Sequence, residues 1–480
     1  MQKRVIVVGG GLAGLAASVA IADAGIPVLL LESRPRLGGR ASSFVDQTTG
    51  ELIDNCQHVA MGCCTNLHDF CNRLGLTDLL RTEPSLTFIG PEGQQSRFAA
   101  GPLPAPLHLT GAFARLGFLT WGEKLSLAGA LKALACDHSA ANRSFADWLR
   151  EHNQSERLME RFWSVVLVSA LSETLDRIDV AYARKVFVDG FMTHRDGWTV
   201  QIPQSPLDEL YGSRVTRWLR ERGGEVRLQA GVAELVAEEG GPVRMVRMVR
   251  LRSGEEIPGD EFVLAVPCER VAAVAPEALR SHSVVTSLAE IEAAPISSVH
   301  LWFDREITEL PHAVLVGRLS QWMFNRHRIL GRTGDVESFE YQVVISASRM
   351  LAGESREDTI SRVVGELSEI WPQVAQARLQ HARIVTEHRA VFSVKPGTDS
   401  LRPVQQSPIP NLQFAGDWTQ TGWPATMEGA VRSGYLAAEN VLSRLGRPRQ
   451  MLCDDLPCSR LSQWLLGLNT NGASGAQRPE

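Results

Sequence analysis

The first thirty-two residues alternate between short apolar runs and a glycine-rich break. Residues 5–8 are four consecutive β-branched apolar residues, the pattern of a central parallel strand covered on both faces. Small and apolar residues over 12–24 predict a helix, and residues 27–31 predict a second strand that ends at Glu32. The pattern therefore predicts a compact βαβ unit.

This stretch superficially resembles a secretory leader, because Lys3 and Arg4 precede a long uncharged run. The glycines at 9, 10, 11 and 14, however, fall where a strand must turn sharply into a helix. We therefore interpret the run as a buried βα unit. Without a leader, we expect a cytoplasmic protein with reduced cysteines.

The pattern changes twice further along the chain. Residues 85–193 carry many Leu, Trp and Phe residues at helical spacing and predict a helical insertion. Mixed patterns then predict a helix at 207–222, strands at 225–228, 243–251, 262–266, 298–303 and 340–345, a helix at 356–370, and a strand, loop and helix over 411–445. The end of the chain from about residue 469 is rich in Gly, Ser, Asn and Gln, and we expect it to be disordered.

Composition narrows the class of ligand. A chain of 480 residues exceeds what one hydrophobic core usually organises, so we expect two domains. With 44% apolar and 21% charged residues its composition is that of a soluble globular protein, and a net charge of −5 argues against nucleic acid as a partner. We expect a small-molecule ligand in a buried pocket.

The eight cysteines include no CxxC pair, and no histidines accompany them at zinc-site spacing, so we predict no metal site. Cys56, Cys63, Cys64 and Cys71 are close enough in sequence to suggest a redox relay. The alternative, which we favour, is that they are buried thiols acting as small apolar side chains.

The main chemical signal is Gly9-x-Gly11-x-x-Gly14, directly after the first strand. Gly9 permits a tight turn, Gly11 lets the backbone approach a pyrophosphate, and Gly14 lets the helix pack closely on the strand. The helix N-terminus offers unpaired N–H groups to anionic oxygens. Glu32, at the end of the second strand, supplies a carboxylate for ribose hydroxyls, so we predict a dinucleotide site.

Two further motifs indicate which dinucleotide is bound. Arg34-Pro-Arg-Leu-Gly-Gly-Arg40 follows the second strand, and Phe414-Ala-Gly-Asp417 precedes Trp423-Pro-Ala-Thr-Met-Glu-Gly-Ala430. Together they resemble the signatures of the large flavoprotein family that contains amine oxidases and phytoene desaturases. The resemblance implies FAD: the first motif would wrap its pyrophosphate and ribityl, and Asp417 would bind ribityl or pyrophosphate oxygens. The last helix would aim its N-terminus at the flavin pyrimidine ring, where it stabilises the charge of reduced flavin.

The resemblance also implies a fold and a division of the chain. It includes Gly231-Val232, where the family lays backbone against adenine, and departs at Pro203-Gln-Ser-Pro206, where many relatives have Pro-x-Gly-Gly. The implied fold is α/β, a Rossmann-like FAD-binding domain of glutathione-reductase type with a discontinuous α+β substrate domain that contains the helical insertion. Residues 1–84, 200–283 and 404–446 would form the first domain, 85–199 and 284–403 the second, and 447–480 a C-terminal extension. The expected cofactor-binding residues are Gly9, Gly11, Leu12, Ala13, Gly14, Glu32, Ser33, Gly38, Gly39, Arg40, Val232, Gly416, Asp417, Thr426 and Met427.

A more specific string is Asp54-Asn-Cys-Gln-His-Val-Ala-Met-Gly62. It resembles the squalene-associated branch of the superfamily, the hydroxysqualene dehydroxylases, although many members have Gly where this chain has Cys56. The resemblance implies reductive removal of the allylic hydroxyl of hydroxysqualene, a C30 polyprenyl substrate, to give squalene for hopanoid or sterol-like lipids. The external donor that reduces the flavin stays open between an NADPH-linked reductase and a free reduced carrier.

Departure of hydroxide as water requires an acid. Asp54 and His58 are the candidate catalytic residues, because the family places their segment beside the isoalloxazine. The alternative for Asp54 is a structural cap, and for His58 a hydrogen bond to backbone or cofactor. Glu428 could act near the flavin or be only a helix N-terminal carboxylate.

Two rival functions stay open. One is a carotenoid or polyprene desaturase or an amine oxidase, and the other is a non-catalytic flavin- or prenyl-binding protein. The aromatic insertion, with Trp121, Trp148, Phe162 and Trp163, fits either a slot for a C30 chain or an ordinary helical core. Residues 102–121 are apolar with few charges, so a peripheral contact with the inner face of the cell membrane is a further hypothesis.

Overall fold

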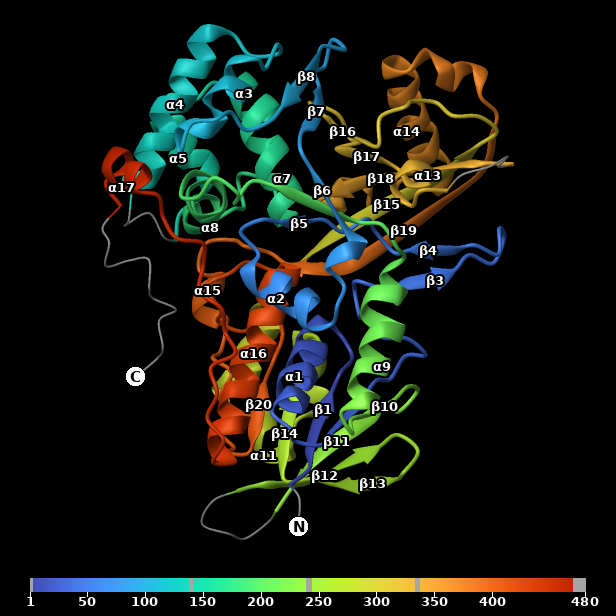
Figure 1. The fold of residues 1–480 in the computed structure, drawn as a ribbon, viewed down its shortest axis with the longest axis vertical. Helices are drawn as coiled ribbons and strands as arrows, with labels where there is room; N and C mark the ends of the chain where they lie inside the picture. The colour runs from blue at the N-terminus through green and yellow to red at the C-terminus, as the bar shows by residue number, and fades with distance from the viewer. Residues whose placement is uncertain (1–2, 138–141, 239–243, 333–336, 469–480) are drawn as a thin grey trace.

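A five-stranded parallel sheet forms the lower part of the molecule (Figure 1). The structure is a computed structural model that describes residues 3–137, 142–238, 244–332 and 337–468. The strand order is β10 (Glu225–Arg227), β2 (Val28–Leu31), β1 (Val5–Val8), β14 (Glu261–Leu264) and β20 (Leu412–Phe414). Every residue of β1, β2 and β14 is buried, which explains their uninterrupted apolar sequences.

Helices from the N-terminal and C-terminal parts of the chain cover this sheet and pack against each other. Helix α1 (Leu12–Asp23) buries eleven of its twelve residues, as a helix that is apolar all round must. It packs on α16 (Met427–Arg444), where a Cβ at Gly434 would come within 2.3 Å of the Ala13 carbonyl oxygen. The two helices therefore meet backbone to backbone. Two smaller sheets, β11 (Val232–Ala237), β12 (Val246–Leu251) and β13 (Glu256–Pro258), and β3 (Ser43–Val45) with β4 (Leu52–Asp54), complete this part of the fold.

Several predicted elements occur with shifted ends. The helix predicted over 207–222 begins at residue 207 as expected and ends one residue early, with a π-helical turn at Glu209–Ser213 followed by α9 (Arg214–Glu221). The strand predicted from residue 243 begins at Val246, and residue 243 itself lies outside the described residues, as does the end of the chain from 469. Helix α14 (Arg356–Ile370) has the predicted bounds.

A seven-stranded mixed sheet forms the upper right of Figure 1. Its order is β19 (Leu379–Phe392), β15 (Ala293–Phe303), β18 (Phe339–Ser346), β17 (Trp322–Asn325), β16 (His312–Leu315), β7 (Leu86–Ile89) and β8 (Gln95–Phe98). The expectation that helices begin at residue 85 is therefore wrong for residues 86–98. Strand β7 pairs in parallel with β16, a partner more than two hundred residues away that local sequence does not reveal. Helix α14 covers one face of this sheet through Val363 and Leu367.

The predicted helical insertion occupies the upper left of Figure 1 and begins at Leu107. It comprises a 3-10 turn (Leu107–Leu109), α3 (Thr110–Ala114), α4 (Trp121–Cys136), α5 (Phe145–Glu151), α6 (Glu156–Leu158), a π-helical turn (Met159–Ser164), α7 (Val165–Leu171), α8 (Val180–Arg184) and a second π-helical turn (Lys185–Met192). Trp148 and Trp163 are fully buried, so they belong to a helical core.

Short elements connect these parts. They include β5 (Ala60–Met61), β6 (Leu80–Glu83) and β9 (Val200–Pro203), which form a three-stranded sheet, α2 (Thr65–Arg73), α13 (Arg326–Ile329) and α17 (Arg460–Leu466). The short helices α10 (Cys268–Val274), α11 (Glu277–Arg280), α12 (Ser283–Thr286) and α15 (Thr398–Leu401) follow β14 or precede β20.

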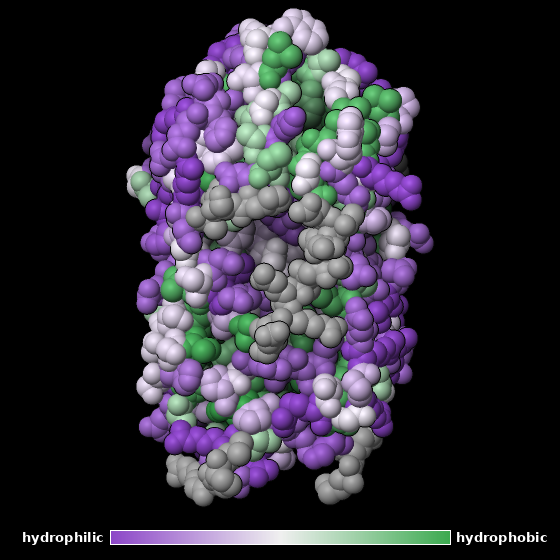
Figure 2. Space-filling model, turned by 90° about the vertical axis from the view of Figure 1, so that its left-hand side faces the viewer, coloured by the Kyte–Doolittle hydropathy of each residue, from purple (hydrophilic) through white to green (hydrophobic). Residues whose placement is uncertain are grey.

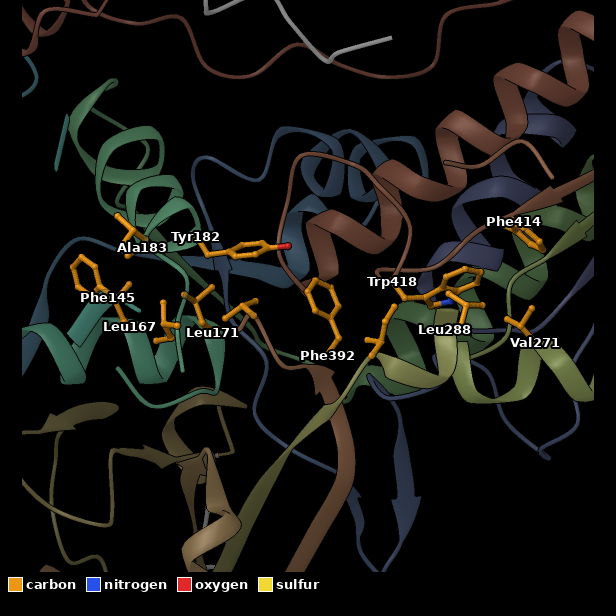
Figure 3. Close-up of a cluster of buried hydrophobic side chains, with 14 of the residues drawn as sticks. Phe145, Leu167, Leu171, Tyr182, Ala183, Val271, Leu288, Phe392, Phe414 and Trp418 are labelled. Carbon is orange, nitrogen blue, oxygen red and sulfur yellow. The ribbon is translucent and has the colours of Figure 1, made fainter. Parts of the chain in front are cut away.

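One continuous hydrophobic cluster joins the helical insertion to the parallel sheet (Figure 3). Phe145 and Leu167 belong to its helical end, and Val271 and Phe414 to its sheet end. Phe392, at the end of β19, lies between the two groups in Figure 3. The insertion is therefore held in place by shared apolar packing rather than by a loose hinge.

Candidate functional site

Gly9, Gly11 and Gly14 lie at the carboxyl end of β1, each for a different steric reason. Gly9 has a φ of +111°, and a Cβ there would come within 2.4 Å of the Ala265 carbonyl oxygen. A Cβ at Gly14 would come within 1.9 Å of the Gly9 carbonyl oxygen, whereas a Cβ at Gly11 would meet no atom within 4 Å. Gly11 therefore faces open space, where the motif requires room for a pyrophosphate.

Helix α1 begins at this open space. Its N-cap is Gly11, which makes no side-chain cap, and its first turn holds no acidic residue. The N–H groups of Leu12 and Ala13 thus begin a helix whose positive end is not neutralised by a side chain. An anionic oxygen supplies both the acceptor and the charge that this end lacks.

The second glycine motif lies directly against the first. The N–H of Gly38 donates to the Gly10 carbonyl at 2.8 Å, and a Cβ at Gly39 would come within 3.0 Å of the Gly11 Cα. Gly38 and Gly39 have φ values of +91° and +60°, a region that favours glycine. The two motifs therefore form one continuous surface around the open space.

Arg40 joins this surface to the C-terminal motif. Its Nη2 donates to Asp417 Oδ1 at 2.7 Å, and its Nη1 donates to the Ala390 carbonyl at 2.8 Å. Burial opposes the charge of Arg40, but the Asp417 carboxylate more than compensates, so the pKa of Arg40 is raised above its ordinary value. The neighbouring Gly416 donates its N–H to Ser433 Oγ of α16 at 2.8 Å. The predicted N- and C-terminal motifs are thus in direct contact.

Helix α16 begins beside this contact between the N- and C-terminal motifs. Thr426 is its N-cap and accepts a hydrogen bond from the Gly429 N–H at 3.1 Å, and Met427 is its first residue. The carboxylate of the buried Glu428 points elsewhere and accepts hydrogen bonds from the N–H groups of Asn66 and Leu67, at 3.2 and 2.7 Å. Glu428 therefore caps the N-terminus of α2.

Glu32 lies at the end of β2 and organises the loops on the other side. Its Oε2 accepts the Gly10 N–H at 2.7 Å, and its Oε1 accepts the Arg34 N–H at 2.7 Å and the Ser33 hydroxyl at 3.1 Å. Its carbonyl accepts the Ala230 N–H at 2.8 Å, two residues before Val232, where β11 begins. The predicted ribose and adenine segments are therefore adjacent.

Asp54 is buried in a charge pair. Its Oδ2 accepts from Arg326 Nη2 at 2.7 Å, and its Oδ1 accepts from Ser43 Oγ at 2.7 Å and from the Leu207 N–H at 2.9 Å. Arg326 also donates to Gln57. With these contacts Asp54 holds Ser43, Leu207 and Arg326 together, which is an anchoring role, and its catalytic role stays a prediction.

His58 lies next to Arg40. Its Nδ1 is 2.9 Å from the Cys56 carbonyl oxygen, and Asn55 of the same segment donates to the Arg40 carbonyl. Burial lowers the pKa of His58, the Cys56 carbonyl and the Asp54 charge oppose this, and the Arg40 charge adds to it. The imidazole is therefore neutral at pH 7, with its Nδ1 proton held by Cys56. The catalytic role of His58 also stays a prediction.

Comparisons with known proteins agree with this geometry. The model of the flavin-containing amine oxidoreductase family matches residues 12–442. The chain belongs to this family. FAD is the family's cofactor, and the glycine loops, the uncapped α1 and the open space at Gly11 fit its pyrophosphate.

Sequence relatives of this chain include carotenoid enzymes. It is 28% identical to the 15-cis-phytoene desaturase of Synechococcus elongatus over 92% of this chain and 96% of that one. It is also 27% identical to a probable zeta-carotene desaturase of the same organism, over 92% of this chain and 98% of that one. Among solved structures, the cyclohexylamine oxidase of Brevibacterium oxydans has a TM-score of 0.68 at 19% identity, with 93% of this chain and 100% of that one covered. The chain is an FAD-dependent oxidoreductase of the amine oxidase and carotenoid desaturase family.

The roles of two buried arginines were not predicted from the sequence. Arg326 pairs with Asp54, as described above. Arg402 is 2% exposed, and its Nη2 donates to the carbonyls of Asp417, Thr419 and Trp423 at 3.2, 2.5 and 2.9 Å. Arg402 therefore holds the loop that carries Asp417, and a lone arginine before a proline gave no sequence signal for this role.

The cysteines of the described residues are free thiols. Cys64 and Cys71 are buried, and burial raises the pKa of Cys71 to about 12. For Cys64 the hydrogen bond to Cys63 raises the pKa first, and burial adds to it. High pKa values disfavour the reactive thiolate, which supports the interpretation of these residues as small apolar side chains.

An apolar wall stands beside the segment that carries His58. It is a hydrophobic cluster containing Trp198, Phe324 and the half-buried Phe98, packed against Val59 and Met61. The ring centroids of Phe98 and Trp198 are 5.8 Å apart. We call this cluster the aromatic wall; its other aromatic members are Phe88, Phe113, Phe191 and Trp322. Several of its aromatic rings are only partly buried, and a wall of such rings would suit an apolar ligand.

Proposed function

We propose that this flavoenzyme reductively removes the allylic hydroxyl of hydroxysqualene and releases squalene. The observation that carries the proposal is the aromatic wall packed against Val59 and Met61, one and three residues after His58. A long polyprenyl chain would bury its hydrocarbon against this wall and so place its allylic carbon near the flavin-binding motifs. The similarity of the string Asp54 to Gly62 to hydroxysqualene dehydroxylases supports the same substrate.

The reaction needs one hydride and one proton. The C–O bond breaks, the oxygen takes up a proton and leaves as water, and the carbon takes up hydride, so the alcohol is reduced by two electrons. Bound reduced FAD supplies the hydride. Arg40 and Asp417 would hold the cofactor, and the aromatic wall would exclude water from the reacting carbon.

His58 would supply the proton from Nε2. Because Nδ1 donates to the Cys56 carbonyl, a second proton can enter only at Nε2. Burial lowers the pKa of His58, so the protonated ring is scarce at neutral pH but strongly acidic. If His58 acts in this way, kcat/KM falls as pH rises above its lowered pKa. His58→Gln removes that dependence, and a wild-type rate that is flat from pH 5 to 8 rules the role out.

A polyprene desaturase is the second candidate. The 28% identity to 15-cis-phytoene desaturase favours it, and the same apolar wall would accept a carotenoid precursor. The direction of electron flow separates the two: a desaturase reduces the oxidised flavin, whereas the dehydroxylase consumes the reduced flavin.

Anaerobic incubation of the holoenzyme with hydroxysqualene and pre-reduced FAD tests the proposal. We expect one squalene per flavin reoxidised, with the product identified by mass spectrometry. A parallel incubation with oxidised FAD and a polyprenyl hydrocarbon tests the alternative: formation of a more unsaturated polyene, with two electrons passing to the flavin, would replace the proposal by the desaturase. If the enzyme converts neither the allylic alcohol with reduced flavin nor the hydrocarbon with oxidised flavin, only a binding function remains.

We also propose that the enzyme meets its insoluble substrate at an anionic membrane surface. Within the predicted stretch 102–121, Leu109, Leu116, Phe118 and Leu119 are buried, whereas Leu103 is 48% exposed and Trp121 is 69% exposed. Close to this stretch in sequence, Leu125 on α4 is 74% exposed, and Trp464 on α17 is 78% exposed. Figure 2 views the side on which α4 and α17 lie in Figure 1 and shows apolar residues gathered in its upper part.

The charges around Trp121 and Leu125 suit such a surface. Lys124 Nζ lies 4.7 Å from the Trp121 ring centroid, and Lys132, later in the same helix α4, is exposed. The acid of this helix, Glu123, is paired with Arg157. No helix in the described part of the chain is both long and apolar enough to cross a bilayer.

Vesicle sedimentation tests the contact. We expect the wild type to pellet with vesicles that contain phosphatidylserine, and Trp121→Ser with Leu125→Ser to remain in the supernatant. Met350→Ser, another exposed apolar side chain at 53%, is the control. Equal sedimentation of the double variant and the wild type would overturn this proposal.

A further inference from the structure

Gln342 on β18 presents an unsatisfied amide inside the protein. The side chain is fully buried, and among the described residues its Oε1 has no hydrogen-bond partner. Its Nε2 donates to Ser298 Oγ at 2.7 Å and lies 3.1 Å from His300 Nε2. Rotation of the amide by 180° exchanges oxygen and nitrogen but still leaves one of them without a protein partner. A buried amide group without a partner is destabilising, so a donor from outside the protein chain would stabilise it.

The neighbouring side chains contact the amide through its nitrogen. This nitrogen faces Ser298 Oγ and His300 Nε2, and His300 Nδ1 is in turn 3.2 Å from Oε1 of the buried Glu340. In this orientation Oε1 is left as an acceptor without a partner among the described residues.

This acceptor lies at the edge of the aromatic wall. Gln342 pairs across the sheet with His300 on one side and with Phe324 on the other, and directly paired side chains share a face. Helix α14 covers the opposite face, where Val299 and Val343 point. Ser298 lies close enough to the Cys56 thiol, in the segment that carries His58, to oppose the rise in the pKa of that thiol caused by burial. The amide therefore lies where the apolar wall meets a group of buried polar side chains and the predicted flavin-facing segment.

We propose that Gln342 Oε1, with Ser298 beside it, is the subsite that binds the hydroxyl of a long-chain allylic alcohol. The inference rests on the proposed function and goes beyond it by assigning the group that distinguishes the alcohol from a hydrocarbon. The substrate hydroxyl donates to Oε1, and its chain lies along the aromatic wall. A pure hydrocarbon of the same length leaves the amide unpaired and binds more weakly.

Equilibrium binding to the FAD-loaded, oxidised enzyme tests the subsite without turnover. Hydroxysqualene and squalene are titrated separately, and the flavin absorbance reports binding. We expect the wild type to prefer the alcohol. Gln342→Met keeps the length of the side chain and removes its polarity, so it weakens hydroxysqualene binding about tenfold and changes squalene binding less than twofold.

Two serines of β15 provide a matched pair. Ser298→Ala should weaken binding of the alcohol in the same direction as Gln342→Met. Ser297→Ala removes an equally buried hydroxyl from the opposite face of the sheet, where Ser297 contacts Ser348 and Thr386. This substitution should leave the affinity for both hydroxysqualene and squalene unchanged. Equal weakening of both ligands by Gln342→Met, or no weakening of the alcohol, would overturn the subsite.

The two proposals fail separately. If the holoenzyme does not convert hydroxysqualene but Gln342→Met abolishes a preference for the alcohol, the proposed function is wrong and the subsite stands. If the enzyme forms squalene and Gln342→Met keeps the preference, the function stands and the subsite is wrong.

Discussion

Gly14→Ala should destabilise the fold, whereas Gly11→Ala should leave the fold intact and weaken FAD binding. A Cβ at Gly14 would lie 1.9 Å from the Gly9 carbonyl oxygen, so backbone that is buried on all sides must move by more than 1 Å to restore ordinary contact. A Cβ at Gly11 meets no atom within 4 Å, and the backbone there, with φ −76° and ψ 172°, is one that alanine adopts readily. The two methyl groups thus probe the same motif in different ways.

The magnitudes follow from these contacts. Gly14→Ala overpacks the strand and helix and should lower the free energy of unfolding of the apoprotein by about 1–3 kcal/mol or more. Gly11→Ala should leave it unchanged or raise it by about 0.5 kcal/mol, since alanine restricts the unfolded chain. In the holoprotein the Gly11→Ala methyl occupies the space expected for the pyrophosphate. Loss of one charge-assisted hydrogen bond, about 1.5–3 kcal/mol, raises the Kd for FAD roughly ten- to hundredfold.

Apoprotein and FAD are sufficient for the assay. Quenching of flavin fluorescence gives the Kd, and thermal unfolding with and without FAD gives the stability. Saturating FAD at about a hundred times its Kd should stabilise the wild type by about 2.7 kcal/mol, and at the same concentration should stabilise Gly11→Ala much less. If Gly11→Ala binds FAD as tightly as the wild type, the open space is not the pyrophosphate site. If it destabilises the apoprotein as much as Gly14→Ala does, the steric argument is wrong.

Three further predictions concern buried charges. Arg326→Met leaves the buried Asp54 carboxylate without its charge partner and should lower the free energy of unfolding by about 3–5 kcal/mol. The control Arg328→Met loses only an exposed pair with Glu306 and should lower the free energy of unfolding, measured with urea, by under about 1 kcal/mol. Equal losses in the two variants would contradict this prediction. Burial, with a smaller contribution from Arg195, lowers the pKa of His108 to about 4, so its contribution is present above pH 6.5 and is lost as pH falls towards 4. Stability should drop by roughly 2 kcal/mol between pH 7.5 and 5 on this account, and His108→Phe should flatten that part of the pH profile. Arg402→Met frees three carbonyls of the loop that carries Asp417 and should raise the Kd for FAD, and an unchanged Kd would show that the loop needs no such support.

Local sequence was sufficient for elements whose partners are close along the chain. The βαβ unit, the steric requirements at Gly9 and Gly14 and the bounds of α14 follow from periodicity, capping and backbone geometry within a few residues. The family motifs identified FAD because they act on the cofactor through short runs of backbone. The predicted domain boundaries and the roles of individual cofactor-binding residues stay predictions.

Tertiary structure alone decided how distant segments meet. The Arg40 to Asp417 pair, the Arg326 to Asp54 pair and the Gln342 to Ser298 hydrogen bond each join residues that lie far apart in sequence. Residues 86–89 form a strand that pairs with β16, and residues 95–98 pair with that strand in turn, against their expected helical context. Periodicity reports which face of an element is buried, but it carries no information about which other element will cover that face. A buried charge or amide acquires its role only from the partner that packing brings to it.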